Sequence, residues 1–282
     1  MKPMGRHVME ALGLCRVVVE DGKVVEISQP RLHRCPMFAK MRGMESLSVD
    51  SVRANIEFRI RDFGLFTEDR QVRGTDIVTF GVSEILSNAI RNGDLDAACI
   101  VSDGCGSAIV TDPEILQGLC GRISGIIETS PIRTVLDAVG EDNVIEPVTV
   151  PIDQVAIAQK AALRPYRKFS VTVCHAEEAA QIRDAYGDRV AVVGVHSSGL
   201  CQKDVELLFD NCDLITACAS GRIREKAFEL RDKGLVEIAG NKVQIVAITD
   251  FGKKIVGDKL RSLGKDFWDG NPPPEDPVPF ID

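Results

Sequence analysis

From about residue 96 onward, short apolar runs alternate with amphipathic segments. The apolar runs predict strands at residues 97–101, 169–174, 189–195, 213–217 and 243–248. The segments around them predict helices at residues 132–139, 152–162, 176–186, 203–209, 223–233 and 253–263. Because strands that alternate with helices need crossover connections, the pattern predicts an α/β fold with a mainly parallel sheet and helices on both faces.

The beginning of the chain follows another pattern. Residues 16–20 and 23–27 are valine-rich and flank an Asp-Gly pair, which is typical of a tight β-hairpin. Residues 48–63 fit both a helix and a strand, but a serine at the start and a glycine after the end favour a helix. A second helix is expected over residues 80–92.

These elements predict three parts along the chain. Residues 1–74 form an N-terminal region with the hairpin and a helix, and residues 75–265 form the α/β core, which divides into two lobes if a boundary lies near residue 150. Residues 266–282 contain five prolines and predict an extended tail. If this tail lies on a neighbouring subunit, the protein is a homo-oligomer.

Composition narrows the class of protein. The net charge of -8 argues against a protein that coats nucleic acid, whose footprint is a basic face. The chain contains no run of 18 or more apolar residues, so no membrane span is predicted. The first ten residues lack the layout of a signal peptide. We therefore expect a cytoplasmic protein whose nine cysteines are thiols, metal ligands or nucleophiles rather than a disulfide framework.

Polar residues follow several predicted strands. In parallel sheets, ligands bind beyond the carboxyl ends of the strands. The predicted ends carry Asp103, Cys105 and Ser107, then Cys174 and His175, then His196 to Cys201, then Cys218 to Arg222, and finally Thr249 and Asp250. Asp103, His196 and Arg222 are the candidate catalytic residues, provided that they converge in a cleft.

Glycine and serine turns at these ends predict a phosphate or cofactor site. Hydroxyls and backbone N–H groups at helix N-termini bind anions, and an arginine adds a guanidinium fork. The candidate cofactor-binding residues are Gly104, Gly106, Ser107, Arg122, Ser197, Ser198, Gly199, Ser220 and Gly221. No GxxxxGK[ST] or strand-linked GxGxxG motif is present, and ordinary turns with hydroxyl caps are the alternative.

The cysteines suggest a metal centre. Cys174, Cys201 and Cys218 each follow a predicted strand at the same edge, and Cys105 is the fourth candidate ligand for zinc or an iron–sulfur cluster. Cys212 starts a strand and lies about 20 Å from the opposite edge, so it is excluded. No CxxC pair supports the site, and buried thiols are the alternative. A nucleophilic cysteine beside His196 is a further option.

Several segments resemble one known family. The stretches HVMEALG, RVVVEDGKVVEI, NIEFRIRDFG, FGVSEIL and TDPEILQGLCGRISGIIETSP resemble methanogenesis marker protein 8. That family has glycine in place of Cys120 and alanine in place of Cys105, which argues against either as a family-wide ligand.

The resemblance implies a methanogenic archaeon, an anaerobic cytoplasm and a role linked to methyl-coenzyme M reductase or its cofactors. We expect a small-molecule or cofactor-handling enzyme, or alternatively a non-catalytic assembly factor that binds a protein of methanogenesis. The resemblance does not imply a particular reaction or a particular catalytic residue for this chain.

Overall fold

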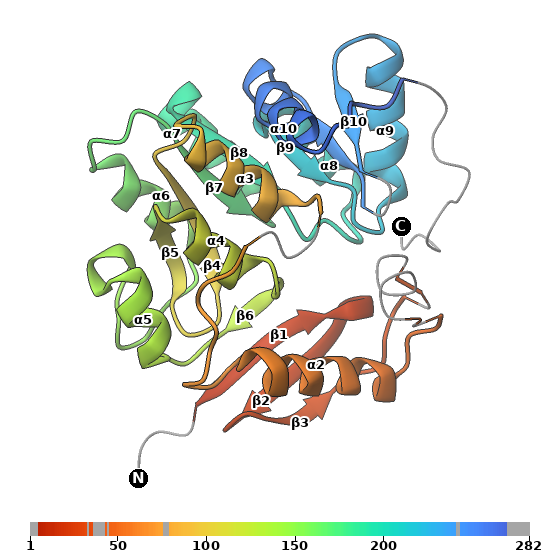
Figure 1. Cartoon of the computed structure of the whole chain (residues 1–282). Coiled ribbons are helices and arrows are strands. Elements are labelled where there is room, and N and C mark those ends of the chain that lie inside the picture. Colours follow the sequence, from red (N-terminus) through yellow and green to blue (C-terminus); the bar gives the residue numbers. More distant parts are fainter. Residues whose placement is uncertain are drawn as a thin grey trace.

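Two β-sheets organise the chain (Figure 1). The computed structural model describes residues 5–32, 34–35, 43, 45–75, 79–240 and 243–269. Among these residues, a four-stranded sheet and one α-helix form a small lobe, and a seven-stranded sheet with the other α-helices forms a large lobe.

The small lobe is antiparallel. Its strand order is β3 (Lys23–Ile27), β2 (Cys15–Glu20), β1 (Arg6–Ala11) and β6 (Ile126–Glu128). The predicted hairpin is β2–β3, and both residues of its Asp-Gly turn have positive φ. Strand β1 was not predicted, and β6 comes from far along the sequence, so the small lobe is not one continuous segment.

Helix α2 (Val49–Phe63) covers one face of the small sheet. Ser48 and Ser51 form a capping box, and Gly64 ends the helix in the left-handed conformation with φ 66°. The choice of helix over strand for this segment is therefore confirmed.

The large sheet is mixed. Its strands, in spatial order, are β10 (Glu237–Ala239), β11 (Ile245–Ala247), β9 (Leu214–Thr216), β8 (Val190–Gly194), β7 (Phe169–Val173), β4 (Ala97–Ser102) and β5 (Gly106–Val110). The four central strands β9, β8, β7 and β4 are parallel to one another. Each outer strand pairs antiparallel with its inner neighbour: β11 with β9, β10 with β11, and β5 with β4.

One strand runs opposite to its predicted direction. Strand β11 pairs antiparallel with both of its neighbours, β10 and β9, instead of parallel to β9 as predicted. Thr249 and Asp250 therefore lie at the edge opposite the other predicted strand ends. There the Thr249 hydroxyl bonds the carboxylate of Asp213, which precedes β9.

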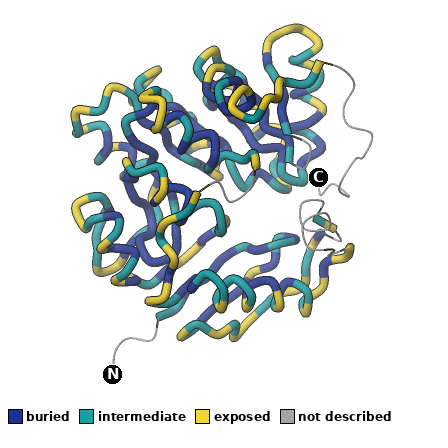
Figure 2. Tube along the Cα trace, in the orientation of Figure 1, coloured by how far each residue is buried: buried dark blue, intermediate teal, exposed yellow. Residues whose placement is uncertain are grey.

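Helices cover both faces of the large sheet, as predicted. One face carries α6 (Gln154–Ala162), α7 (Ala176–Tyr186), α8 (Gln202–Asn211) and α9 (Gly221–Asp232). The other carries α3 (Val82–Arg91), α4 (Pro113–Cys120), α5 (Arg133–Val139) and α10 (Asp250–Ser262). The central strands are buried between these layers (Figure 2). No helix in the described ranges is long and apolar enough to cross a membrane.

The start of the C-terminal tail packs on its own chain. The Trp268 amide donates to the carbonyl of Ile238 in edge strand β10 at 2.9 Å, and the indole stacks on Phe228. These first tail residues cover a sheet edge that would otherwise be unpaired. Residues 270–282 lie outside the described residues, so an oligomer formed through them stays a prediction.

The two lobes meet at the carboxyl edge of the parallel strands. Val101, Ile152 and Ala219 of the large lobe pack against the apolar core of the small lobe. The predicted ligand edge of the large sheet therefore faces the small lobe.

Candidate functional site

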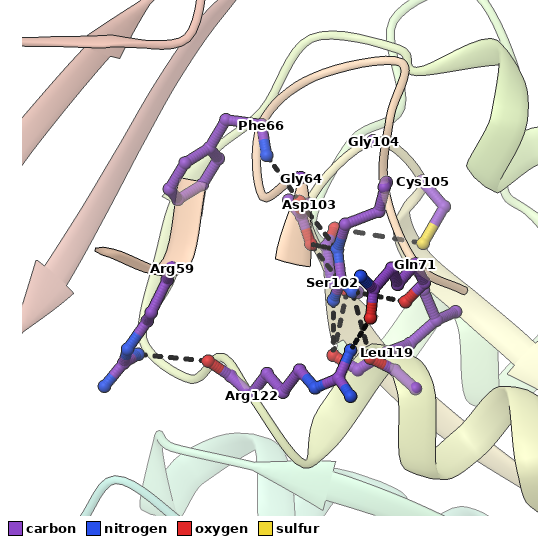
Figure 3. A network of polar contacts seen from close by, with 12 residues as sticks. Arg59, Gly64, Phe66, Gln71, Ser102, Asp103, Gly104, Cys105, Leu119 and Arg122 are labelled. Atoms are coloured by element: carbon purple, nitrogen blue, oxygen red, sulfur yellow. Dashed lines mark hydrogen bonds and ion pairs between the residues drawn. The ribbon is translucent and has the colours of Figure 1, made fainter. Parts of the chain in front are cut away.

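Two polar clusters occupy this junction. The first, which we call the buried network, centres on Asp103 just after β4 (Figure 3). Asp103 accepts hydrogen bonds from the Phe66 amide at 2.9 Å and from the Ser102 hydroxyl at 3.1 Å. The Arg70 Nε lies 3.1 Å from both carboxylate oxygens. Both charged side chains have 0% exposure.

The remaining contacts of Arg70 are backbone carbonyls. Its Nη1 donates to the carbonyls of Gln71 and Gly118, and its Nη2 donates to that of Leu119. Gly118 and Leu119 lie in the last turn of α4, where carbonyls lack helical partners and favour a cation. The buried network thus fastens the segment after α2 to β4 and α4.

This geometry gives Asp103 a structural role. A fully buried carboxylate with three protein partners has no surface to offer a ligand, so its assignment as a catalytic residue is not supported. Cys105, two residues later, is also fully buried, and burial raises the pKa of its thiol.

The second cluster, which we call the junction pair, consists of Glu10 and His196. Glu10 lies in β1 of the small lobe, and His196 follows β8 of the large lobe with φ 55°. The His196 Nε2 lies 2.8 Å from Oε1 of Glu10, and the side chains are 24% and 35% exposed, respectively. An acid–base pair that bridges the lobes thus remains open to solvent.

Gly125 makes room for the junction pair. Its carbonyl accepts the Glu10 amide at 2.7 Å, and its φ is +73°. A Cβ at this position would lie 2.3 Å from the Glu10 carbonyl oxygen and 2.8 Å from Cε1 of His196. Only glycine fits this approach without displacing the imidazole.

Electrostatics fix the state of Glu10. The hydrogen bond with His196 is the main cause that lowers the pKa of Glu10, and Arg31 adds a smaller favourable charge. Glu10 is therefore ionised near neutral pH. An ionised carboxylate orients an imidazole and stabilises its protonated form, which is what general acid–base catalysis requires.

Cys174 follows β7, beside the end of β8. The residue is exposed, yet partial burial of its thiol and the nearby carboxylates Glu178 and Glu10 raise its pKa to about 11. The thiol is therefore protonated at neutral pH and is not an activated nucleophile.

The other cysteines do not complete a metal centre. Cys201 is exposed before α8, with its Sγ 3.2 Å from Asp204, and burial raises the pKa of Cys218, which interacts electrostatically with Cys35. Within the described ranges, no three histidine, cysteine, aspartate or glutamate side chains are grouped so that they could hold a metal ion. The predicted zinc or iron–sulfur site at Cys105, Cys174, Cys201 and Cys218 is not supported.

The serines predicted to bind a cofactor have protein partners. The hydroxyls of Ser197 and Ser198 bond the carbonyls of Thr216 and Cys218, and Ser220 caps α9 through the Ile223 amide. These bonds connect the loops that follow β8 and β9. They agree with the alternative from the sequence, in which the serines belong to ordinary turns with hydroxyl caps and not to a cofactor site.

Gly199 lies on the loop after β8, and Arg222 lies in the first turn of α9. Arg222 donates to the carbonyl of Leu200 at 3.1 Å, Gly199 is exposed, and Gly221 is the first residue of α9.

The polar groups in and beside the turn between β4 and β5 also have protein partners. The Ser107 hydroxyl bonds Gln154 and accepts the Asp153 amide, and the Gly104 amide donates to Thr129. A Cβ on Gly106 would lie 2.1 Å from the carbonyl oxygen of Val150, so that glycine permits a backbone approach rather than ligand contact.

Sequence reasoning found His196 but missed its partner. Glu10 is 186 positions away in the sequence, on a strand that the pattern did not reveal. Arg70 was missed as well, since a single arginine in an irregular segment carries no periodic signal.

Comparisons with known proteins place the chain among archaeal proteins. The family described as "Uncharacterized protein conserved in archaea (DUF2099)" matches residues 7–261. The chain is 44% identical over 267 residues to the uncharacterized protein MJ0054 of Methanocaldococcus jannaschii, covering 93% of each chain. No solved structure matches the chain significantly.

Proposed function

Because the chain belongs to the DUF2099 family, which is conserved in archaea, we propose that it is a small-molecule enzyme with the junction pair as its acid–base group. The resemblance to methanogenesis marker protein 8 supports a cofactor-handling role linked to methyl-coenzyme M reductase. The observation that carries the proposal is the 2.8 Å contact between Glu10 and His196 across the lobe junction.

The two residues of the junction pair have different roles. Glu10 engages Nε2 of His196, which leaves Nδ1 as the nitrogen that takes up or delivers a substrate proton. The carboxylate holds the imidazole in one orientation and stabilises the imidazolium formed after proton uptake. A well-placed acid–base group of this kind contributes about 10²- to 10⁴-fold in rate.

Backbone strain at the same edge supports this assignment. His196 has φ 55° and Ala219 has φ 40°, and each follows a parallel strand. Residues other than glycine rarely adopt positive φ, and such strained positions cluster at active sites.

The test is anaerobic purification of the parent and of two variants, Glu10→Gln and His196→Gln, followed by mass spectrometry of bound small molecules. We expect the parent to carry a product and both variants to accumulate its precursor. Glu128→Gln is the matched control, because Glu128 pairs with Arg6 on the same small sheet.

An identical bound molecule in all four proteins would contradict the acid–base role. Co-purification of a protein without any small molecule would favour the assembly factor instead.

A further inference from the structure

Two cysteines meet across the lobe junction, and we call them the inter-lobe thiols. Cys35 lies in the segment after β3 and packs against the apolar core of the small lobe. Cys218 follows β9 of the large lobe, and the next residue, Ala219, packs against that same core. The two thiols interact electrostatically, and neither is in a disulfide. A cysteine of each lobe is therefore present where the lobes dock.

The loops around Cys218 hold its thiol in place. Burial is the main effect on this thiol and raises its pKa, whereas the Thr216 hydroxyl, the Ser197 amide and the charge of Arg224 favour the thiolate. The hydroxyl of Ser198 donates to the Cys218 carbonyl at 2.9 Å, which fixes the backbone. The thiolate is the form that attacks a disulfide, so this site provides donors for the reactive form of the side chain.

A second pair of thiols provides a comparison. Cys105 and Cys120 also interact electrostatically, but both belong to the large lobe. Cys105 has 0% exposure, so a reagent cannot reach it, and burial raises the pKa of Cys120 to about 12. Both inter-lobe thiols are only half-buried. Of these two pairs, the inter-lobe thiols alone combine access from solvent with a position between the lobes.

We propose that Cys35 and Cys218 form a reversible disulfide that locks the two lobes together under oxidising conditions. The oxidant is a low-molecular-weight disulfide. One inter-lobe thiolate attacks a sulfur of that molecule, expels one thiol and forms a mixed disulfide. The other inter-lobe thiolate then attacks the cysteine sulfur of the mixed disulfide and expels the second thiol. The two cysteines lose two protons and two electrons, and the external disulfide becomes two thiols.

This redox lock is a function beyond acid–base catalysis and does not depend on it. In a reducing compartment the inter-lobe thiols stay reduced, so the disulfide is a response to oxidation and not a permanent cross-link. The lock acts beside the junction pair, because Ser198, which bonds Cys218, lies two residues after His196.

The experiment treats the reduced full chain with oxidised glutathione, alkylates the remaining thiols and maps disulfides by proteolysis and mass spectrometry. We expect two peptides joined through Cys35 and Cys218 in a protein of unchanged oligomeric state. Dithiothreitol should reverse the cross-link. The reaction should become faster as the pH rises, because more of each thiol is then in the thiolate form.

Single substitutions on each lobe test the assignment. Cys35→Ser and Cys218→Ser should each abolish the cross-link, and circular dichroism shows whether each variant is folded. Cys201→Ser is the matched control, because Cys201 is an exposed thiol of the large lobe whose neighbour is the carboxylate of Asp204. Cys105→Ser tests the buried pair. Both control variants should form the cross-link as the parent does.

Thermal unfolding measures the lock itself. The oxidised parent should have a higher Tm than the reduced parent, because a cross-link between distant positions restricts the unfolded chain. Oxidised glutathione should leave the Tm of Cys35→Ser without this increase. A cross-link between other cysteines would overturn the inference, and so would glutathione bound to Cys35 or Cys218 without a cross-link. An equal Tm for the oxidised and reduced parent would reject the lock.

Discussion

Asp103 of the buried network and His196 of the junction pair follow strands at the same edge of the large sheet, yet the two clusters differ in burial and in the number of their protein partners. Asp103 and Arg70 have 0% exposure and are surrounded by protein donors and acceptors. Glu10 and His196 share one hydrogen bond and keep a quarter to a third of their side chains exposed.

The difference shows that a position directly after a strand does not by itself make a carboxylate catalytic. A group that is fully satisfied and buried stabilises one conformation, and its removal leaves an uncompensated charge. A half-exposed pair contributes little to stability but retains a nitrogen for proton transfer. Burial and the number of protein partners therefore distinguish the buried network, which has a structural role, from the junction pair that we propose as the acid–base group.

The largest expected effect comes from breaking the buried network. Arg70→Met removes the cation and leaves Asp103 buried without its partner, so the free energy of unfolding should fall by about 3–5 kcal/mol. Urea denaturation followed by circular dichroism measures the change.

A double variant sharpens this expectation. Arg70→Met combined with Asp103→Leu removes both charges and should be less destabilised than Arg70→Met alone. A loss below about 1 kcal/mol in the single variant would show that the network behaves like a surface ion pair, and the comparison would collapse.

The next effect probes the contact that shapes the junction pair. Gly125→Ala places a Cβ against the Glu10 carbonyl and the His196 ring at positive φ. We expect a loss of about 1–3 kcal/mol from overpacking and backbone strain, together with displacement of the imidazole. Denaturation measures the loss, and the His196 ring resonances in an NMR spectrum report the displacement. An unchanged spectrum would mean that Gly125 does not position His196.

Much of the fold was accessible from the sequence because local pattern and topology agree there. The apolar runs of β4, β7, β8 and β9 are separated by helical segments, and that arrangement requires parallel neighbours. Strands β1, β6 and β11 escaped prediction or were misassigned. They are short or pair with distant segments, and such pairing is a tertiary property that no local period records.

The site was less accessible for a related reason. The carboxyl-edge rule selected both His196 and Asp103, because position along a strand carries no information about burial. The partners Arg70 and Glu10 come from segments whose approach depends on how the lobes dock. The cysteines at Cys174, Cys201 and Cys218 share an edge but not a group that could hold a metal ion.

A pH dependence of stability should originate near the buried network. His7 is buried, with Nδ1 2.7 Å from the Thr129 hydroxyl, and burial lowers its pKa below the ordinary value of 6.5. Below that pH the unfolded chain binds a proton that folded His7 resists, so stability is full above pH 6.5 and falls as the pH drops. His7→Asn keeps a polar group beside Thr129 and should flatten the pH profile between 7 and 5. Parallel profiles for parent and variant would rule out His7 as the source.

The smallest effect on stability should come from the junction pair, although its effect on function should be the largest. Glu10→Gln removes the charge that faces His196 but keeps a hydrogen-bond acceptor in a half-exposed site. Surface-accessible ion pairs contribute about 0–1 kcal/mol, so the denaturation midpoint at neutral pH should hardly move.

The stability from the lowered pKa of Glu10 is fully present above the ordinary value of 4.5, and it is lost as the pH falls from there through the lower, folded-state value. The variant and the parent should therefore converge in stability at acidic pH. Denaturation at pH 7 and below pH 4 checks this convergence. A loss at pH 7 as large as that of Arg70→Met would instead mark Glu10 as a structural residue, because a catalytic pair that bridges two docked lobes does not need to hold them together.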